Sequence, residues 1–209
     1  MKSIALLLLI AMGSLMANEA DDIIKKVEEN ARGKDVYMKM RMEIASKRYE
    51  RSITMESWAE GKKKSFTKIL EPARERGITF LNLDNQMWQY VPKIERVIKI
   101  PPSMMLQSWM GSDFTNDDLV KQSSIVDDYT PTVLDREGDI VTLQLTPRED
   151  AAVVWGKIVS KIDTRSYTQV EEIFYDDMDE KVRIMRYSKT EKFGSHYLPT
   201  VMEVIPLDP

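Results

Sequence analysis

The spacing of apolar residues changes near position 33, from a helical period to a period of two. Within Asn18–Arg32, the residues Ile23, Ile24, Val27 and Ala31 recur at helical intervals, with charged residues between them. This period is typical of an amphipathic helix that buries one face. We therefore expect one helix at the start of the chain.

The segment after this helix alternates strictly. Met38, Met40, Met42 and Ile44 are separated by charged residues, which predicts a strand with one dry and one wet face. Later segments with the same period carry apolar pairs on one face: Ile53 with Met55, Ile78 with Phe80, Trp88 with Tyr90, and Ile98 with Ile100. The whole pattern predicts about eleven strands joined by short turns, which favour antiparallel neighbours. We expect a mainly β (α+β) fold built on one large curved sheet or an open barrel.

One stretch, IPPSMMLQSWMGSDFTNDDLVK at 100–121, interrupts this pattern. Its two prolines end a strand, because proline cannot donate a hydrogen bond to a ladder. A run of apolar residues follows in what looks like a connection: Met104, Met105, Leu106, Trp109 and Met110. Thr115 and Asp118 then form a weak capping box, which predicts a short helix from Asp117 to Gln122.

Composition and charge exclude several classes of protein. The chain has 209 residues, 43% of them hydrophobic and 31% charged, with a net charge of −4. This length suits one domain, and an acidic chain lacks the basic face that nucleic-acid binding requires. The chain has no cysteine, so it has no disulfide, no cysteine nucleophile and no lipid-modified N-terminal cysteine.

The first residues have the order of a secretory signal peptide. Lys2 precedes the apolar run Ile4–Met12, and Ala17 is a small residue at a suitable cleavage position. The apolar run is too short to span a bilayer. We expect a signal peptide at 1–17, cleavage near Ala17, one domain at 18–209 and export to the periplasm. The alternatives are a hydrophobic first strand and an uncleaved anchor.

No pattern predicts a catalytic or metal site. The chain has no G-x-S-x-G, H-E-x-x-H or phosphate-binding loop, so we expect no enzyme and no cofactor. Asp113, Asp117 and Asp118 do not have EF-hand spacing, and a lone histidine such as His196 is usually structural. The basic run Lys62–Lys64 is either a solvated edge or a docking point for a membrane partner or anionic headgroups.

Three motifs in the middle of the chain resemble a known family. They are P-A-R-E-R-G at Pro72–Gly77, W-x-Y-x-P at Trp88, Tyr90 and Pro92, and M-G-S-D-F-x-x-D-D-L at Met110–Phe114 and Asp117–Leu119. In this order they resemble the outer-membrane lipoprotein-sorting family of LolA/LolB-like proteins, over about 71–119. The resemblance implies a strongly bent antiparallel sheet that forms an incomplete barrel, with helices as a lid over an apolar cavity for acyl chains.

The resemblance also implies a set of ligand-binding residues in the cavity and lid. They are Met38, Met40, Met42, Ile44, Ile53, Met55, Phe80, Trp88, Tyr90, Ile98, Met104, Met105, Leu106, Trp109, Met110 and Phe114. Each has two interpretations, either plain core or contact with a ligand. Methionine suits both, because its side chain adapts to irregular surfaces.

The function that the resemblance implies is a periplasmic carrier. It would bind acyl chains of lipoproteins or lipids and move them towards the outer membrane. The alternative is a partner-binding accessory or sensor domain of a membrane lipid transporter or an envelope-stress system. Expected partners are an acylated lipoprotein or lipid and an inner-membrane ABC or RND-type transporter. We expect a monomer with peripheral membrane contact.

Overall fold

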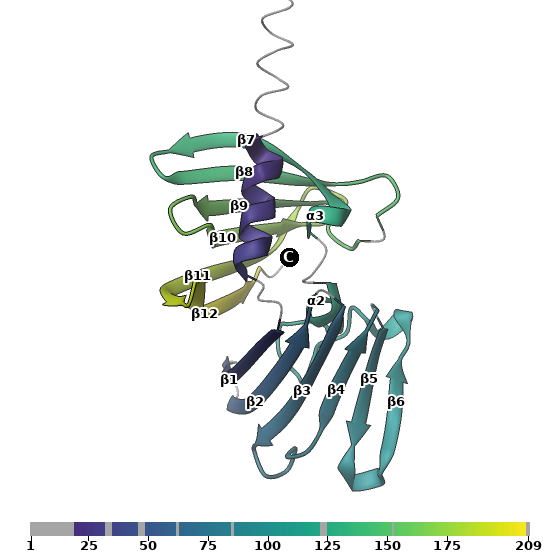
Figure 1. Cartoon of the computed structure of the whole chain (residues 1–209). Coiled ribbons are helices and arrows are strands. Elements are labelled where there is room, and N and C mark those ends of the chain that lie inside the picture. Colours follow the sequence, from purple (N-terminus) through teal and green to yellow (C-terminus); the bar gives the residue numbers. More distant parts are fainter. Residues whose placement is uncertain are drawn as a thin grey trace, which may run out of the picture. The chain divides into compact units, whose positions relative to one another are not determined.

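The computed structural model describes residues 19–31, 35–45, 49–61, 63–84, 86–121, 125–151 and 153–207. These residues form two six-stranded antiparallel sheets, β1–β6 and β7–β12, so the predicted mainly β class is confirmed (Figure 1). The expectation of one curved sheet of about eleven strands was wrong, because the strands divide between two sheets and neither is closed or strongly curled. The division falls at 101–128, where a long connection replaces a hairpin.

The chain divides into two compact units, one within 32–124 and the other formed by 1–31 with 125–209. The prediction of one domain at 18–209 stays a prediction. Residues 1–17, with the predicted signal peptide, lie outside the described residues, as do Lys62 and Gln122. Among the described residues, no helix has the length and apolar character needed to cross a membrane.

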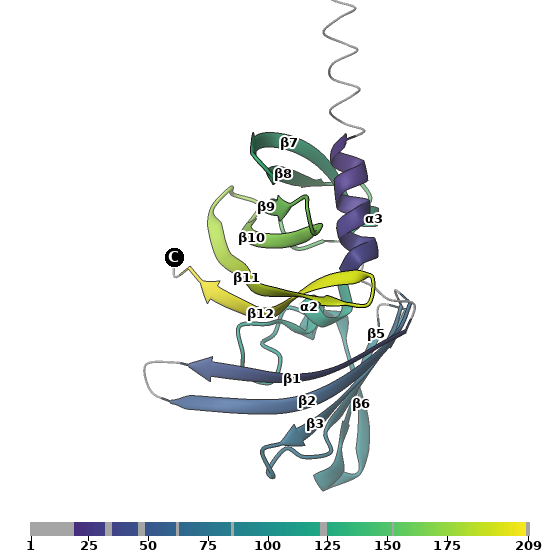
Figure 2. The same cartoon turned by 60° about the vertical axis from the view of Figure 1, so that its left-hand side comes forward.

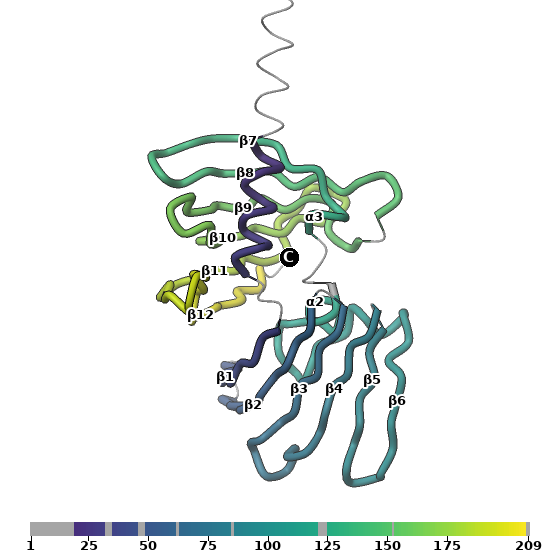
Figure 3. Tube along the Cα trace, viewed as in Figure 1, coloured from purple at the N-terminus to yellow at the C-terminus, as the bar shows by residue number. Residues whose placement is uncertain are grey.

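The unit within 32–124 is a meander in which each strand pairs with the next along the chain (Figure 3). Its strands are β1 (Asp35–Ala45), β2 (Glu50–Glu60), β3 (Lys64–Glu71), β4 (Thr79–Leu83), β5 (Gln86–Val91) and β6 (Arg96–Ile100). The 3₁₀ turns η1 (Pro92–Ile94) and η2 (Pro102–Met104) flank β6, and the short helix α2 (Asn116–Lys121) follows. The predicted alternation of β1 is confirmed, with Met40, Met42 and Ile44 more buried than the charged residues between them.

The other unit is a second meander. After the short helix α3 (Ile125–Asp128) come β7 (Tyr129–Glu137), β8 (Ile140–Pro147), β9 (Lys157–Asp163), β10 (Thr168–Tyr175), β11 (Lys181–Phe193) and β12 (His196–Pro206). The predicted first helix is confirmed at 19–31, and it lies against one face of this sheet (Figure 2). Ile23, Ile24 and Val27 are buried as expected, but Ala31 is exposed, because it stands on the last turn of the helix.

Asn30 fixes the end of this helix to the sheet. Its side-chain amide donates to the carbonyls of Tyr197 (2.6 Å) and Ser166 (3.1 Å), and its carbonyl oxygen accepts from the Tyr197 N–H (2.7 Å). His196 Nδ1 donates to the main-chain carbonyl of Asn30 at 3.0 Å. This contact agrees with the structural role expected for the lone histidine.

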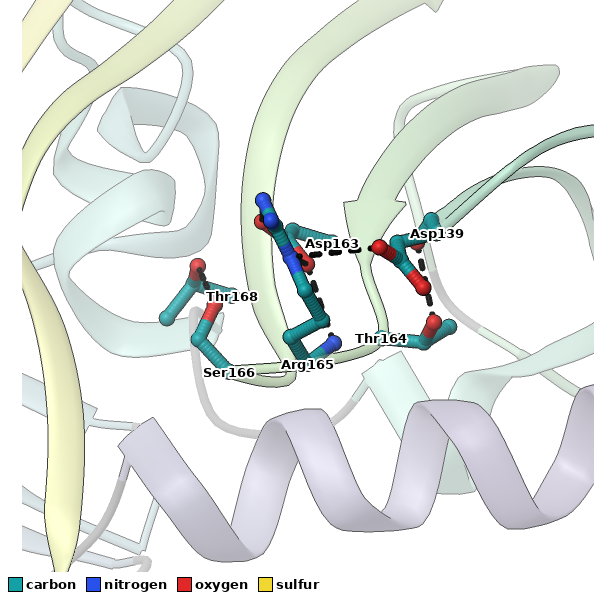
Figure 4. A network of polar contacts seen from close by, with 6 residues as sticks. All are labelled: Asp139, Asp163, Thr164, Arg165, Ser166 and Thr168. Atoms are coloured by element: carbon teal, nitrogen blue, oxygen red, sulfur yellow. Dashed lines mark hydrogen bonds and ion pairs between the residues drawn. The ribbon is translucent and has the colours of Figure 1, made fainter.

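A polar network ties two hairpin turns of the same unit together (Figure 4). The N–H and hydroxyl of Thr164 both donate to the Asp139 carbonyl at 2.9 Å. Arg165 donates to both carboxylate oxygens of Asp163, at 3.1 and 2.7 Å. This guanidinium therefore holds the pKa of the Asp163 carboxyl below its usual range.

A charged pair is buried within the β7–β12 sheet. The Glu172 carboxylate accepts from Tyr187 Oη (2.6 Å) and from Ser160 Oγ (3.2 Å). Burial raises the pKa of Glu172, and the two hydrogen bonds and nearby Arg183 oppose that rise. The Arg183 guanidinium stacks on aromatic rings, including that of Phe174 at 4.4 Å.

Candidate functional site

One face of the β1–β6 sheet, which we call the inner face, carries a continuous apolar cluster. Met40 pairs with Met55 and Met55 with Ile69, so these three side chains stand in one row across β1, β2 and β3. Ile69 is completely buried and Met55 nearly so. The buried strand residues of the cluster are Ile44, Ile53, Met55, Ile69, Phe80, Met87 and Ile100.

Residues 101–121, which we call the covering segment, pack on this face. Trp109 is 3% exposed, and its ring lies 5.2 Å from that of Phe80, tilted by 58°. Met105, Met110 and Phe114 are partly buried against the same cluster. Contact with the sheet therefore explains three of the five apolar residues of the run, Met105, Trp109 and Met110, since each of these side chains leaves water when it packs there.

The covering segment is held in shape by its own backbone. The Trp109 N–H donates to the Phe114 carbonyl at 2.7 Å, and the Asp117 N–H donates to the Met105 carbonyl at 2.8 Å. At the tip between them, Met110 (φ 53°) and Gly111 (φ 75°) are both left-handed. Glycine adopts this conformation freely, whereas methionine there stores strain of about 1 kcal/mol.

The predicted capping box is confirmed and closes the segment. The Asp118 carboxylate accepts from the Thr115 N–H at 2.8 Å, and the Asp118 N–H donates to Thr115 Oγ1 at 3.2 Å. The helix starts at Asn116, one residue before the predicted start. Asp118 therefore has a structural role, and no group of three or more His, Cys, Asp or Glu within the described ranges is arranged to hold a metal ion.

Arg51 joins the sheet to the tip of the covering segment. Its Nη1 donates to the Met110 carbonyl at 2.9 Å, and its Nη2 forms an ion pair with Glu75 from the β3–β4 connection. Arg74 also pairs with Glu75, at 3.0 Å. A side chain 23% exposed on β2 thus links three separate pieces of this unit. A second link is weaker, from Asn82 Nδ2 to the Leu119 carbonyl at 3.3 Å.

Comparisons with known proteins agree with this fold. Residues 61–209 match the model of a family described as "Uncharacterized protein". A DUF1329 family protein from Desulfovibrio piger has a TM-score of 0.84 at 21% identity, over 91% of this chain and 86% of that one. A domain described as outer membrane lipoprotein-sorting, from Vibrio parahaemolyticus, has a TM-score of 0.79 at 21% identity, over 90% and 85%. A LolA superfamily protein from Nitrosomonas europaea has a TM-score of 0.71 at 21% identity, over 90% and 85%.

The chain belongs to the family whose model matches residues 61–209, and it has the fold of the LolA superfamily protein. At this level of identity, the three solved structures show the shared fold alone. None of the curated proteins matches the chain.

The LolA-like sheet brings together ten of the sixteen residues predicted to bind ligand. They are Met40, Met42, Ile44, Ile53, Met55, Phe80, Met105, Trp109, Met110 and Phe114. These ten residues come from β1, β2, β4 and the covering segment, and together they make one apolar cluster. Their contact with a ligand stays a prediction.

Six predicted residues lie elsewhere. Met38 and Ile98 share the inner face, but each is 41% exposed towards the margins of the sheet. Met104 and Leu106 are exposed, and neither belongs to the buried cluster.

The predicted inward position of Trp88 and Tyr90 was wrong. Trp88 pairs with Leu81, and Met87 with Asn82, so the β5 aromatics stand on the face opposite to Phe80. Met87 is fully buried in their place. Apolar residues lie on both faces of β5. The face with the larger aromatic side chains was therefore predicted to be the inner face, although it is the outer one.

Sequence reasoning also missed Arg51. A signal was present, because Arg51 has the same parity as Ile53 and Met55, and a charged residue on the dry face of a strand requires a partner. Ile69, Met87, Ile100 and Val120 were missed as members of the cluster. Ile100 lies on the face that the sequence assigned through Ile98, and Met87 was missed because the β5 aromatic residues were expected to face inward.

Proposed function

We propose that this LolA-like chain is a periplasmic carrier that binds acyl chains of lipoproteins or lipids and moves them towards the outer membrane. One observation carries the proposal: the apolar inner face of β1–β6 is covered by a segment that packs on it through partly buried methionines and aromatic residues. An acyl chain could take the place of the covering segment's side chains on the same surface. We further propose that the site binds and releases its cargo and performs no reaction.

The energetics of an acyl chain support this proposal. Transfer from water to an apolar surface gains about 0.8 kcal/mol per CH₂ group. The methionines at the border of the cluster, Met40, Met42, Met105 and Met110, are unbranched and can repack around a flexible chain. The strained tip at Met110 and the polar link through Arg51 give the covering segment a small number of contacts to break when it opens.

The first test is mass spectrometry of lipids extracted from protein that is purified from the periplasm without detergent. We expect an acyl lipid or lipopeptide in a stoichiometric amount, and its class would identify the cargo. Absence of bound lipid, together with failure to take up fluorescent fatty-acid and phospholipid probes, would contradict the proposal.

A pair of variants connects uptake to the inner face. Met42→Glu and Met105→Glu each place a carboxylate at the border of the cluster, where both side chains are only partly buried. We expect each to abolish uptake of the acyl probes, because an unpaired charge cannot be buried beside an acyl chain. Leu134→Glu, at an exposed position on β7, is the matched control and should keep full uptake. Normal uptake by both inner-face variants would exclude this face as the site.

A further inference from the structure

The other face of the β1–β6 sheet, which we call the outer face, carries a row of aromatic and apolar side chains. The register pairs Tyr37 with Trp58, Trp58 with Phe66, Phe66 with Leu81, and Leu81 with Trp88, and the row ends with Lys99 on β6. The Trp58 ring lies 5.4 Å from that of Tyr37 and 5.9 Å from that of Phe66. One row of side chains therefore crosses every strand of the sheet.

This row faces solvent. Tyr37 is 58% exposed, and Trp58, Phe66 and Leu81 are between 37% and 39% exposed. The next row on the same face adds Tyr90 paired with Val97. Isolated exposed apolar residues are ordinary, but a contiguous apolar surface of this kind marks a binding site.

Charge is divided unevenly along the outer face. On β1 and β2, the rows beside the aromatic row carry one lysine and three carboxylates, namely Lys39, Asp35, Glu56 and Glu60. On β3–β6, the aromatic row and its two neighbouring rows carry three lysines and no carboxylate. The lysines are Lys64, Lys68 and Lys99.

Most of the positive charge of these lysines is not neutralised by a carboxylate and can attract an anionic ligand. Lys64 shares an exposed ion pair with Glu60 at 3.2 Å. Within the described ranges, neither Lys68 nor Lys99 has a carboxylate partner, and the Lys99 ammonium lies 5.5 Å from the centre of the Trp88 ring. The part of the outer face on β3–β6 is thus apolar, aromatic and cationic.

We propose that the outer face of β3–β6 docks on an anionic phospholipid surface. Tryptophan and tyrosine favour the boundary between headgroups and acyl chains, and lysines reach the phosphates with flexible side chains. Phe66, Leu81 and Trp88 enter this boundary, while Lys64, Lys68 and Lys99 contact the headgroups. A protein partner would require directional polar groups, whereas these three rows offer lysines with no carboxylate among them, which suits a diffuse layer of negative charge.

Vesicle binding tests this proposal. The experiment uses the protein in the form purified from cells, and intact-mass measurement determines its N-terminus. We expect co-sedimentation with vesicles of phosphatidylcholine and phosphatidylglycerol, weak co-sedimentation with phosphatidylcholine alone, and release at high salt because screening weakens attraction to the surface. The double variant Lys68→Gln/Lys99→Gln should reduce binding about tenfold. Phe66→Ser/Leu81→Ser should reduce it while leaving the response to salt in place.

The matched controls lie on the other unit. Leu134→Ser removes an exposed apolar residue and Lys181→Gln an exposed lysine, and both should bind vesicles as the unaltered protein does. Equal binding by the outer-face and control variants would overturn the proposal. So would absence of vesicle binding, or self-association in sedimentation experiments that Phe66→Ser abolishes, since the face would then bind a second copy of the chain.

The result is independent of the proposed carrier function. Acyl-probe uptake should be normal in Phe66→Ser/Leu81→Ser, because neither side chain belongs to the inner-face cluster. Normal uptake by this variant without loss of vesicle binding would therefore be a failure of the outer-face proposal alone.

Discussion

The Arg51 guanidinium donates a 2.9 Å hydrogen bond to the main-chain carbonyl of Met110, at the strained tip of the covering segment. The same guanidinium pairs with Glu75, which orients it. One charged side chain on β2 therefore controls how firmly the covering segment is attached at its tip.

Arg51→Leu should loosen the covering segment. It removes the bond to Met110 and leaves the Glu75 carboxylate, itself largely buried, without its Arg51 partner. Hydrogen exchange of the amides of Trp109 and Ser112 should become faster, and the free energy of unfolding should fall by about 1–3 kcal/mol. Arg41→Leu is the control, since Arg41 pairs with Glu43 on an exposed edge. Unchanged exchange in Arg51→Leu would show that packing alone holds the segment.

Trp109→Ala should be among the most destabilising single changes in this unit. It empties a buried position beside Phe80, and truncations of this kind cost about 3–5 kcal/mol. The Trp109 indole N–H has no hydrogen-bond partner within the described residues. Trp109→Phe should therefore cost much less than Trp109→Ala, because it removes no hydrogen bond. Urea unfolding measures both, and equal losses would indicate that the indole N–H has a partner.

Asn30→Ala should release the last turn of the first helix from the β7–β12 sheet. Three main-chain groups of Ser166 and Tyr197 lose their side-chain partner. The free energy of unfolding should fall by about 1–3 kcal/mol in total. Lys25→Ala, at an exposed position of the same helix, should leave stability unchanged. Thermal unfolding compares the two, and equal midpoints would contradict the anchoring role of Asn30.

Glu172→Gln should change how stability depends on pH. The pKa of Glu172 is raised in the folded state, chiefly by burial, so the folded protein binds a proton more tightly than the unfolded chain does. This residue therefore makes folding less favourable above its folded-state pKa, and the penalty disappears as pH falls towards 4.5, the ordinary pKa of a glutamate. The difference in unfolding free energy between variant and unaltered protein should shrink between neutral and acidic pH. A difference that is constant across this range would exclude titration of Glu172.

The sequence alone predicted the elements with strong periods. Met40, Met42 and Ile44 define the inner face of β1, and Ile23 and Val27 define the buried face of the first helix. Both patterns run over several residues, and the opposite face of each element carries charged residues. Only one assignment of the buried face was therefore consistent with the sequence. The cap at Thr115 was found for a similar reason, because its hydrogen bonds are local.

The sequence failed where a long-range pairing decides the outcome. Both faces of β5 carry apolar residues, so only its register with β4, Asn82 opposite Met87, shows which face is inner. The division into two sheets depends on where a long connection leads. Arg51 obtains its role from Glu75 and Met110, 24 and 59 positions away, and no local pattern specifies those partners.

The contacts of Asn30 also have a consequence for the order in which the molecule assembles. Its partners at Ser166 and Tyr197 follow it by 136 and 167 positions. The ribosome makes the helix before the 32–124 unit, whereas Ser166 and Tyr197, which bind its last turn, are made after that unit. The whole 32–124 unit emerges in between and can fold on its own contacts. The hydrogen bonds between Asn30 and Tyr197 can therefore form only after β12 has been made, so the helix end is anchored late in folding.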